Sequence, residues 1–277
     1  MRAKRSNLAE GGRNTSNAAF GYDRLVRFGA LKRHWERLGR QDPYGAVLTR
    51  GVWDVERFFR SGVDEITAVL RHAARLGLTV SRRRALDFGC GVGRVSQALA
   101  AHFDRVVGVD VASSMIAQAR QINRVPERCS FELNRAIHLR RFDTGSFDLV
   151  YSRMVLQHMP PPLVRGYLPE LVRVVAPGGA LVFQLPGRIG IDSREVFLSA
   201  PVEGSALKRA LPRPLVRAWR ALKYQRIVSR HKEMAMYGMD RDAVVALIQS
   251  TGARILDIHD DYAHGTEAPG FEYCVTK

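Results

Sequence analysis

The chain contains few cysteines and no long apolar run. Its 277 residues include three cysteines, Cys90, Cys129 and Cys274, without any Cys-x-x-Cys pair. This odd, scattered set excludes a disulfide framework and is typical of reduced thiols in a cytosolic protein. No stretch approaches the roughly 18 apolar residues that span a membrane, and residues 1–17 lack the apolar centre of a signal peptide. We therefore expect a cytoplasmic protein.

Acidic residues are outnumbered by basic ones. The chain has 43 Lys and Arg against 27 Asp and Glu, a formal net charge of +16. The excess is densest in residues 188–238, with 11 basic and 4 acidic side chains. Such a surface can attract nucleic acid, an anionic membrane or an acidic substrate. An arginine-rich surface without any functional consequence is the other open interpretation.

One glycine-rich stretch organises the rest of the chain. Ala85 to Phe88 is a short apolar segment, glycines follow at 89, 91 and 93, and a helical pattern resumes from Arg94. Glycines allow a sharp turn and leave no Cβ between the main chain and a ligand. The helix that follows directs unpaired N–H groups and the positive end of its dipole at the loop. This strand–loop–helix corner is typical of a nucleotide-like binding site.

An acidic residue follows at an informative distance. Asp110 ends the run Arg105 to Asp110, 21 residues after Gly89. This spacing is typical of a carboxylate that accepts hydrogen bonds from ribose hydroxyls at the end of the next parallel strand. The third glycine, Gly93, comes two residues after the second, which departs from the dinucleotide pattern G-x-G-x-x-G.

Four sequence blocks in order resemble the class I S-adenosylmethionine-dependent methyltransferases. They are Leu86–Gly93, Val107–Met115, Gly145–Ser152 and Leu171–Gly179. The resemblance covers roughly residues 60–187 and, more loosely, 239–277. It implies that S-adenosylmethionine is the cofactor, with S-adenosylhomocysteine as the product.

The resemblance also assigns cofactor contacts. It implies that the loop glycines lie against the methionine part, that Asp110 holds the ribose and that Met115 flanks the adenine. Asn134 stands where the family usually has an acid that contacts the adenine amino group, and its amide oxygen can accept the same bond. The full set of expected cofactor-binding residues is Asp87, Gly89, Cys90, Gly91, Gly93, Asp110, Val111, Met115, Asn134, Arg135 and Ser152.

The pattern of strands and helices predicts the fold. We expect an α/β, Rossmann-like, doubly wound sheet of seven strands with helices on both faces, because strands alternate with helices. The resemblance implies that the last strand is antiparallel and inserted beside strand five. The expected strands are 85–88, 105–109, 129–133, 147–151, 180–184, 254–258 and 271–275. The expected core helices are 63–76, 94–102, 113–123, 163–175 and 241–250.

Two further parts flank this core, which we place at residues 61–187 and 239–277. Residues 1–60 form a helical extension, disordered over about the first 17 residues, whose apolar stripe Leu25, Phe28, Leu31, Trp35 and Leu38 should pack over the cofactor side. A short segment from Val52, capped by Asp54, starts another helix. Residues 188–238 form a helical lid over the acceptor site, with an amphipathic helix at 215–230.

The catalytic machinery leaves little trace in sequence, because a sulfonium methyl is already activated and the enzyme mainly aligns its acceptor. His158 is the candidate base if the acceptor must lose a proton, and lining the pocket is the alternative. Arg153, Tyr22, Trp53 and Tyr237 are candidates for the acceptor pocket, with the core as the alternative for the aromatic residues.

Several subclasses lack their signatures. No Asp/Asn-Pro-Pro-Tyr/Phe motif follows the strand at 147–151, which argues against amino-methylation of adenine or glutamine, and no Pro-Cys dipeptide supports a cytosine methyltransferase. The sequence shows no cluster of metal ligands, so no metal is predicted.

We therefore expect a methyltransferase for a small-molecule acceptor, at a hydroxyl oxygen of a natural product, sugar or lipid. One alternative is an RNA or protein methyltransferase, which the scarcity of aromatic residues in the basic segment disfavours. Another is a non-catalytic membrane-surface or interaction module, with peripheral membrane contact through residues 215–230. The sequence carries no signal for an oligomeric state.

Overall fold

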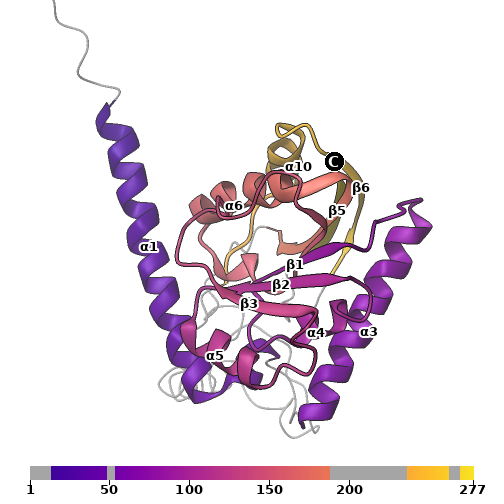
Figure 1. The fold of residues 1–277 in the computed structure, drawn as a ribbon. Helices are drawn as coiled ribbons and strands as arrows, with labels where there is room; N and C mark the ends of the chain where they lie inside the picture. The colour runs from indigo at the N-terminus through magenta and orange to yellow at the C-terminus, as the bar shows by residue number, and fades with distance from the viewer. Residues whose placement is uncertain (1–13, 49–53, 188–235, 262–268) are drawn as a thin grey trace, which may run out of the picture.

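The computed structural model describes residues 14–48, 54–187, 236–261 and 269–277, with the backbone alone over 14–27 (Figure 1). Trp53, the helix expected at 215–230 and nearly all of the expected lid lie outside the described residues. None of the described helices is both long and apolar enough to cross a lipid bilayer.

The chain forms helices and strands in the alternating order that the sequence predicts. The helices are α1 (Asn14–Gln41), α2 (Pro43–Val47), α3 (Val55–Arg75), α4 (Arg94–Leu99), α5 (Ser113–Gln121), the 3-10 turn η1 (Leu156–His158), α6 (Pro161–Val174) and α10 (Arg241–Gln249). The strands are β1 (Arg84–Phe88), β2 (Arg105–Asp110), β3 (Cys129–Leu133), β4 (Phe147–Ser152), β5 (Val175–Pro186), β6 (Arg254–Asp260) and β7 (Gly270–Thr276).

The seven strands form one sheet in the order β3-β2-β1-β4-β5-β7-β6. Strands β1 to β5 are parallel to one another, whereas β7 is antiparallel to both β5 and β6. The prediction of a last strand inserted beside strand five is confirmed. The order reverses between β1 and β4, and parallel sheets bind ligands at the carboxyl ends of the strands at such a point.

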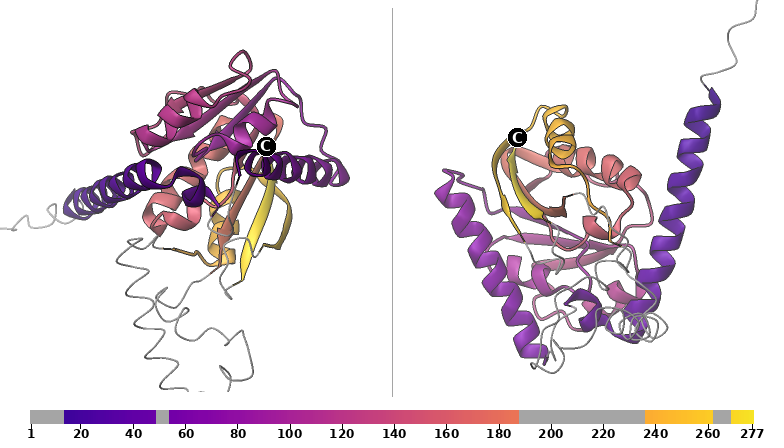
Figure 2. Two further views of the ribbon diagram at one scale, coloured as in Figure 1. Left: turned by 90° about the horizontal axis from the view of Figure 1, so that it is seen from below. Right: turned by 180° about the vertical axis from the view of Figure 1, so that it is seen from behind.

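Helices cover both faces of the sheet (Figures 1 and 2). On one face, apolar residues of α6 and α10, such as Leu168 and Val244, pack on Val107 and Val150. On the other face, residues of α3, α4 and α5 pack on the alternate strand positions; Ile66, Leu99, Ile116, Val106 and Leu149 are examples. Because successive strand residues point to opposite faces, nearly continuous apolar strands are required to fill both layers.

The N-terminal helices are docked beside the sheet. Asp42 caps α2, accepting a hydrogen bond from the Gly45 N–H at 2.9 Å, and Pro43 starts that helix. Helix α1 is longer than the segment predicted from Phe20, and it begins inside the stretch expected to be disordered. Its contact with α5 is close, because a Cβ at Gly39 would lie 2.4 Å from the Ser114 hydroxyl.

The two helices predicted at Val52 and at Val63–Leu76 are one continuous helix, α3. Asp54 caps it as expected, accepting from the Arg57 N–H at 2.8 Å. Gly62 lies inside the helix because α3 crosses the start of α4 there, and a Cβ would lie 2.5 Å from the Arg94 carbonyl oxygen. The glycine therefore marks a helix crossing and not a helix end.

Strand β5 is longer than predicted. It runs from Val175 to Pro186, through Pro177-Gly-Gly179, which was expected to separate the preceding helix from the strand. The pairing with β4 shifts between Phe147 and Leu149, so the extra residues form an irregularity in a continuous strand.

Two glycines inside helices predict opposite effects of the same substitution. Gly62→Ala should destabilise the protein by about 1–3 kcal/mol, because the new methyl group meets fixed backbone. Gly29→Ala is the matched control: its Cβ would meet only the Arg33 guanidinium, at 3.5 Å, and alanine favours a helix by about 1 kcal/mol. Urea unfolding measures both, and equal effects would contradict the proposed crossing.

Candidate active site

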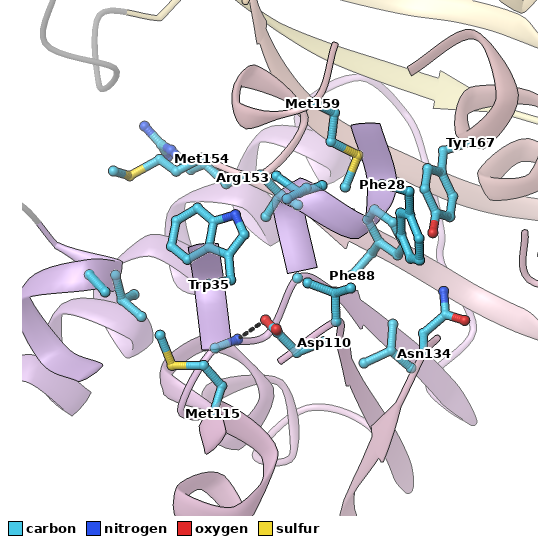
Figure 3. A pocket seen from close by; sticks show the side chains of 18 residues that line it. Phe28, Trp35, Phe88, Asp110, Met115, Asn134, Arg153, Met154, Met159 and Tyr167 are labelled. Atoms are coloured by element: carbon cyan, nitrogen blue, oxygen red, sulfur yellow. Dashed lines mark hydrogen bonds between the residues drawn. The ribbon is translucent and has the colours of Figure 1, made fainter. Parts of the chain in front are cut away.

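A cavity opens at the carboxyl ends of β1, β2 and β4, where the strand order reverses (Figure 3). It encloses about 750 Å³, including the part open to solvent. Its lining consists of Phe28, Leu31, Trp35, Ala46, Val47, Phe88, Gly89, Gly91, Val109, Asp110, Val111, Met115, Asn134, Arg153, Met154, Val155, Met159 and Tyr167.

The glycine loop forms the floor of the cavity. Gly89 and Gly91 have φ angles of 84° and 53°, which residues with a side chain rarely adopt. A Cβ at Gly89 would lie 2.3 Å from Val155 Cγ2, and one at Gly91 would lie 2.7 Å from Val47 Cγ2. Both valines line the cavity, so the bare backbone lets them pack directly on the loop, and Gly89 and Gly91 border the cavity with main chain alone.

Asp110 ties the loop to the end of β2. Its carboxylate accepts hydrogen bonds from the Gly91 N–H at 3.0 Å and from the Ala112 N–H at 2.8 Å (Figure 3). Burial raises the pKa of Asp110, while these backbone bonds oppose the rise. A carboxylate accepts about four hydrogen bonds, and the Val111 N–H also contributes one, so part of its acceptor capacity remains for ribose hydroxyls. The residue fits the role that the sequence predicts for it.

The other predicted adenosine contacts lie around the same cavity. Met115 and Val111 follow Asp110 in the wall, and Asn134 lies at the end of β3. The Asn134 side-chain oxygen accepts from the Ala136 N–H at 3.2 Å, which leaves one lone pair for an amino group. These residues, with the open glycine floor, fit an S-adenosyl ligand.

Helix α1 supplies one wall of the cavity. Phe28, Leu31 and Trp35 come from it at helical spacing, and Figure 3 shows Trp35 across the cavity from Asp110. The N-terminal extension thus packs over the cofactor side, as expected from its apolar stripe. This wall is apolar and continues from the adenosine-binding residues without a break.

Glu36, which the sequence does not single out, fastens that wall. Its carboxylate accepts from the Ser113 hydroxyl at 3.1 Å and from the Ser114 N–H at 3.2 Å, at the N-terminus of α5. Helix α5 has no side-chain cap of its own. Glu36 therefore caps α5 from another helix, a role that only the contact between α1 and α5 reveals.

Five predicted cofactor residues lie next to the cavity without lining it. Cys90 is buried in the loop, and Gly93 begins α4 with a φ angle of 86°. Arg135 is exposed, whereas the Ser152 hydroxyl is fully buried and has no hydrogen-bond partner within the described part of the chain. Asp87 is buried and accepts from the Ser96 hydroxyl at 2.6 Å, beneath the loop.

The predicted acceptor residues are divided. Arg153 lines the cavity. His158 does not, but its buried ring packs edge-on against Trp35, with ring centroids 5.1 Å apart. Tyr237 donates its N–H to the Gln157 carbonyl at 2.6 Å, behind η1. Trp53 and the side chain of Tyr22 lie outside the described residues.

Several lining residues were missed. Met154 has a φ angle of 57°, unusual for a residue with a side chain, and its N–H donates to Gln184 Oε1 at 3.3 Å. Met159 and Tyr167 come from beyond the end of β4, and the Tyr167 hydroxyl donates to the Ala136 carbonyl at 2.6 Å. No sequence pattern marks these side chains, because the folding of the β4–α6 connection brings them to the cavity.

The sequence also shows no cluster of metal ligands, yet His72, Asp257 and His259 lie together in the structure. The sequence could not reveal the trio, since His72 and Asp257 are 185 positions apart.

Asp87 predicts a pH dependence of stability. Burial raises its pKa to about 7, against the effect of the Ser96 hydrogen bond. The folded state therefore holds this proton more tightly than the unfolded chain, in which an aspartate titrates near 4. The resulting stabilisation is complete below about pH 4 and is lost as the pH rises through about 7.

Asp87→Asn removes this titration. We expect the unfolding free energy of the variant, relative to the wild type, to rise between about pH 4 and pH 7 in urea titrations. Asp104→Asn, at an exposed aspartate, is the control and should leave the pH profile unchanged. Parallel profiles for Asp87→Asn and the wild type would contradict the prediction.

Known proteins with similar sequences are methyltransferases. The family described as "Methyltransferase domain" matches residues 85–179. A trans-aconitate 2-methyltransferase from Rhodopseudomonas palustris is 30% identical over 76% of this chain and 86% of its own length. A 2-methyl-6-phytyl-1,4-hydroquinone methyltransferase from Synechocystis is 29% identical over 63% of this chain. The match spans about half of that protein's length (52%). A ubiquinone biosynthesis O-methyltransferase from Hahella chejuensis is 28% identical over 58% of this chain and 65% of that protein.

Solved structures share the fold at lower identity. Magnesium protoporphyrin IX methyltransferase from Synechocystis, with bound SAH, superposes with a TM-score of 0.57 at 16% identity, over 91% of this chain and 99% of that one. Phosphoethanolamine N-methyltransferase 1 from Haemonchus contortus gives a TM-score of 0.60 at 13% identity, over 91% of this chain and 50% of that one. With the glycine floor and Asp110 in place at the strand-order reversal, the chain belongs to the class I S-adenosylmethionine-dependent methyltransferases, and S-adenosylmethionine is its cofactor.

Proposed function

We propose that the enzyme methylates an oxygen atom of a small-molecule acceptor, a hydroxyl on a natural product, sugar or lipid. One observation carries the proposal: the part of the cavity around Asp110 continues directly into an apolar wall formed by α1. A compact acceptor with an apolar body can lie against that wall beside the cofactor.

The cofactor half of the cavity would be held by a few groups. The main chain at Gly89 and Gly91 would border the methionine part, Asp110 would accept from the ribose, and Met115 and Asn134 would border the adenine. S-adenosylmethionine supplies a methyl group already activated on a sulfonium. The residues of this chain therefore need to align the acceptor and exclude water, and alignment alone can contribute about 7 kcal/mol or more.

The apolar wall suits this task. Phe28, Leu31 and Trp35 from α1 line the cavity together with Met159 and Tyr167, and Figure 3 shows Phe28 beside Tyr167. These side chains exclude water without competing for hydrogen bonds. The assignment of residues 188–238 as a lid remains a prediction, because nearly all of this segment lies outside the described residues.

Charge around Arg153 favours a neutral acceptor. Its guanidinium lies 2.9 Å from an Asp261 carboxylate oxygen and 3.7 Å from one of Glu272. Burial lowers the pKa of Arg153, but Tyr151, Glu65 and these two carboxylates raise it by more. The net pKa is therefore raised, and the guanidinium stays cationic. Since two carboxylates already compensate this cation, an anionic acceptor would have to compete with them.

A hydroxyl acceptor has to lose a proton, and the described lining offers few bases. Asp110 is engaged with the loop, Arg153 is a cation, and the Tyr167 hydroxyl donates to a carbonyl. The His158 ring packs against Trp35 on the side away from the cavity. Its Nε2 lies 3.2 Å from Gln157 Nε2. We therefore retain His158 as the candidate base.

The alternatives gain no support from the described residues. The basic segment that motivated nucleic-acid or membrane binding falls almost entirely outside them. An RNA or protein substrate would also have to displace the apolar wall that closes over the cavity.

Methyl transfer from labelled S-adenosylmethionine tests the proposal. We expect labelled product with a hydroquinone carrying an apolar tail, and little with trans-aconitate. Asp110→Ala should weaken S-adenosylhomocysteine binding more than about 100-fold in calorimetry, since two hydrogen bonds to a charged group contribute at least about 3 kcal/mol. Asp104→Ala is the exposed control. Transfer to trans-aconitate alone would overturn the neutral-acceptor assignment, and unchanged binding by Asp110→Ala would overturn the site.

The candidate base predicts a second outcome. His158→Gln should lower kcat about 100-fold or more while S-adenosylhomocysteine binding stays unchanged, because general-base assistance contributes at this scale. His138→Gln, a histidine away from the cavity, is the control. A variant with wild-type kcat would assign His158 to packing alone.

A further inference from the structure

A polar cluster lies on the side of the molecule opposite α1, where α3 meets β6 at the edge of the sheet (Figures 1 and 2). His72 comes from α3, and Asp257 and His259 come from β6. One ligand atom from each side chain lies within 4.8 Å of the other two. None of these residues lines the cavity, so the cluster has no role in the proposed methyl transfer.

Both imidazole nitrogens lie close to one oxygen of Asp257. Asp257 Oδ2 lies 2.9 Å from His72 Nε2 and 2.8 Å from His259 Nδ1. The two imidazole rings are 4.9 Å apart at 67°. Two imidazole nitrogens and one carboxylate oxygen make a set that binds Zn²⁺ well.

The spacing is close to what a metal requires. Tetrahedral Zn²⁺ with bonds of 2.0–2.1 Å separates its ligand atoms by about 3.3 Å. The two contacts of Asp257 would therefore open by about 0.4 Å. The side chains are 27%, 29% and 43% exposed, so an ion and one water ligand can enter from solvent.

An irregularity in β6 creates this arrangement. The pairing of β6 with β7 shifts between Ile255 and Asp257, which inserts an extra residue at Leu256. Ile255 packs on the face covered by α6 and α10, so regular alternation would direct Asp257 to that face as well. The bulge instead turns Asp257, and with it His259 two residues on, toward α3. Bulges of this kind re-aim side chains next to functional sites.

A carboxylate stands behind one of the imidazoles. Glu272 Oε1 lies 3.6 Å from His259 Nε2, on the side away from Asp257, and its side chain is only 8% exposed. Histidines that bind metal commonly donate their second N–H to such a carboxylate, which leaves the first nitrogen free for the ion. The same Glu272 approaches Arg153, so the cluster is linked to the wall of the cavity.

We propose that His72 Nε2, Asp257 Oδ2 and His259 Nδ1 form a binding site for a divalent transition metal, with Zn²⁺ as the ion that this ligand set suits best. A water molecule completes the coordination. The ion joins α3 to β6, an edge strand that pairs within the sheet with β7 alone. A hydrogen-bonded trio without metal is the competing explanation.

Zn²⁺ titration of the metal-free full-length protein tests the site. We expect saturable binding of one ion in calorimetry and a Zn²⁺-dependent rise in Tm. His72→Ala and His259→Ala should each weaken binding more than about 100-fold, because even loss of an outer-shell partner costs 10–100-fold. Co²⁺ should give the intense visible absorption of a four-coordinate site in the wild type and lose it in His259→Ala.

Controls separate a metal site from a structural trio. His102→Ala, at an exposed histidine elsewhere, should bind Zn²⁺ as the wild type does. Asp257→Asn keeps the side-chain volume, and circular dichroism in chelator reports whether each variant is folded. A wild type without saturable binding, or His72→Ala and His259→Ala variants that bind like the wild type, would overturn the proposal.

Discussion

The hydrogen bond from the Gly91 N–H to the Asp110 carboxylate is the interaction on which the active site depends. It joins the loop after β1 to the end of β2 at the place where the strand order reverses. The bond orients the carboxylate, which also lines the cavity. It also fixes the glycine loop, whose bare backbone at Gly89 and Gly91 borders the cavity.

The second constraint is the docking of α1. Helix α1 forms one wall of the cavity with Phe28, Leu31 and Trp35, and Glu36 secures it by capping α5. Because α5 begins shortly after Asp110, this contact ties the apolar wall to the glycine corner.

Charged groups connect this region with the opposite edge of the sheet. Arg153 at the cavity pairs with Glu272 on β7, and Glu272 approaches His259, which belongs to the proposed metal cluster. On the other side, Glu65 of α3 pairs with Arg94 at 2.8 Å and accepts from the Tyr151 hydroxyl at 2.9 Å. An ion that fastens α3 to β6 would thus restrain two of the supports beneath the glycine loop and the cavity wall.

The sequence by itself determined the strand order of appearance, the glycine corner and Asp110, because these depend on local patterns: apolar runs, turn residues and a fixed spacing. Other features depend on contacts between distant segments. The sequence predicts separate helices on the two sides of Gly62, but α3 runs through it across the Arg94 backbone. Glu36 caps α5 only because α1 is docked there. His72 and Asp257 meet only because β6 pairs as the edge strand with a bulge that turns Asp257 toward α3. Tertiary structure alone decided these, since no local pattern records which distant backbone or side chain a residue will meet.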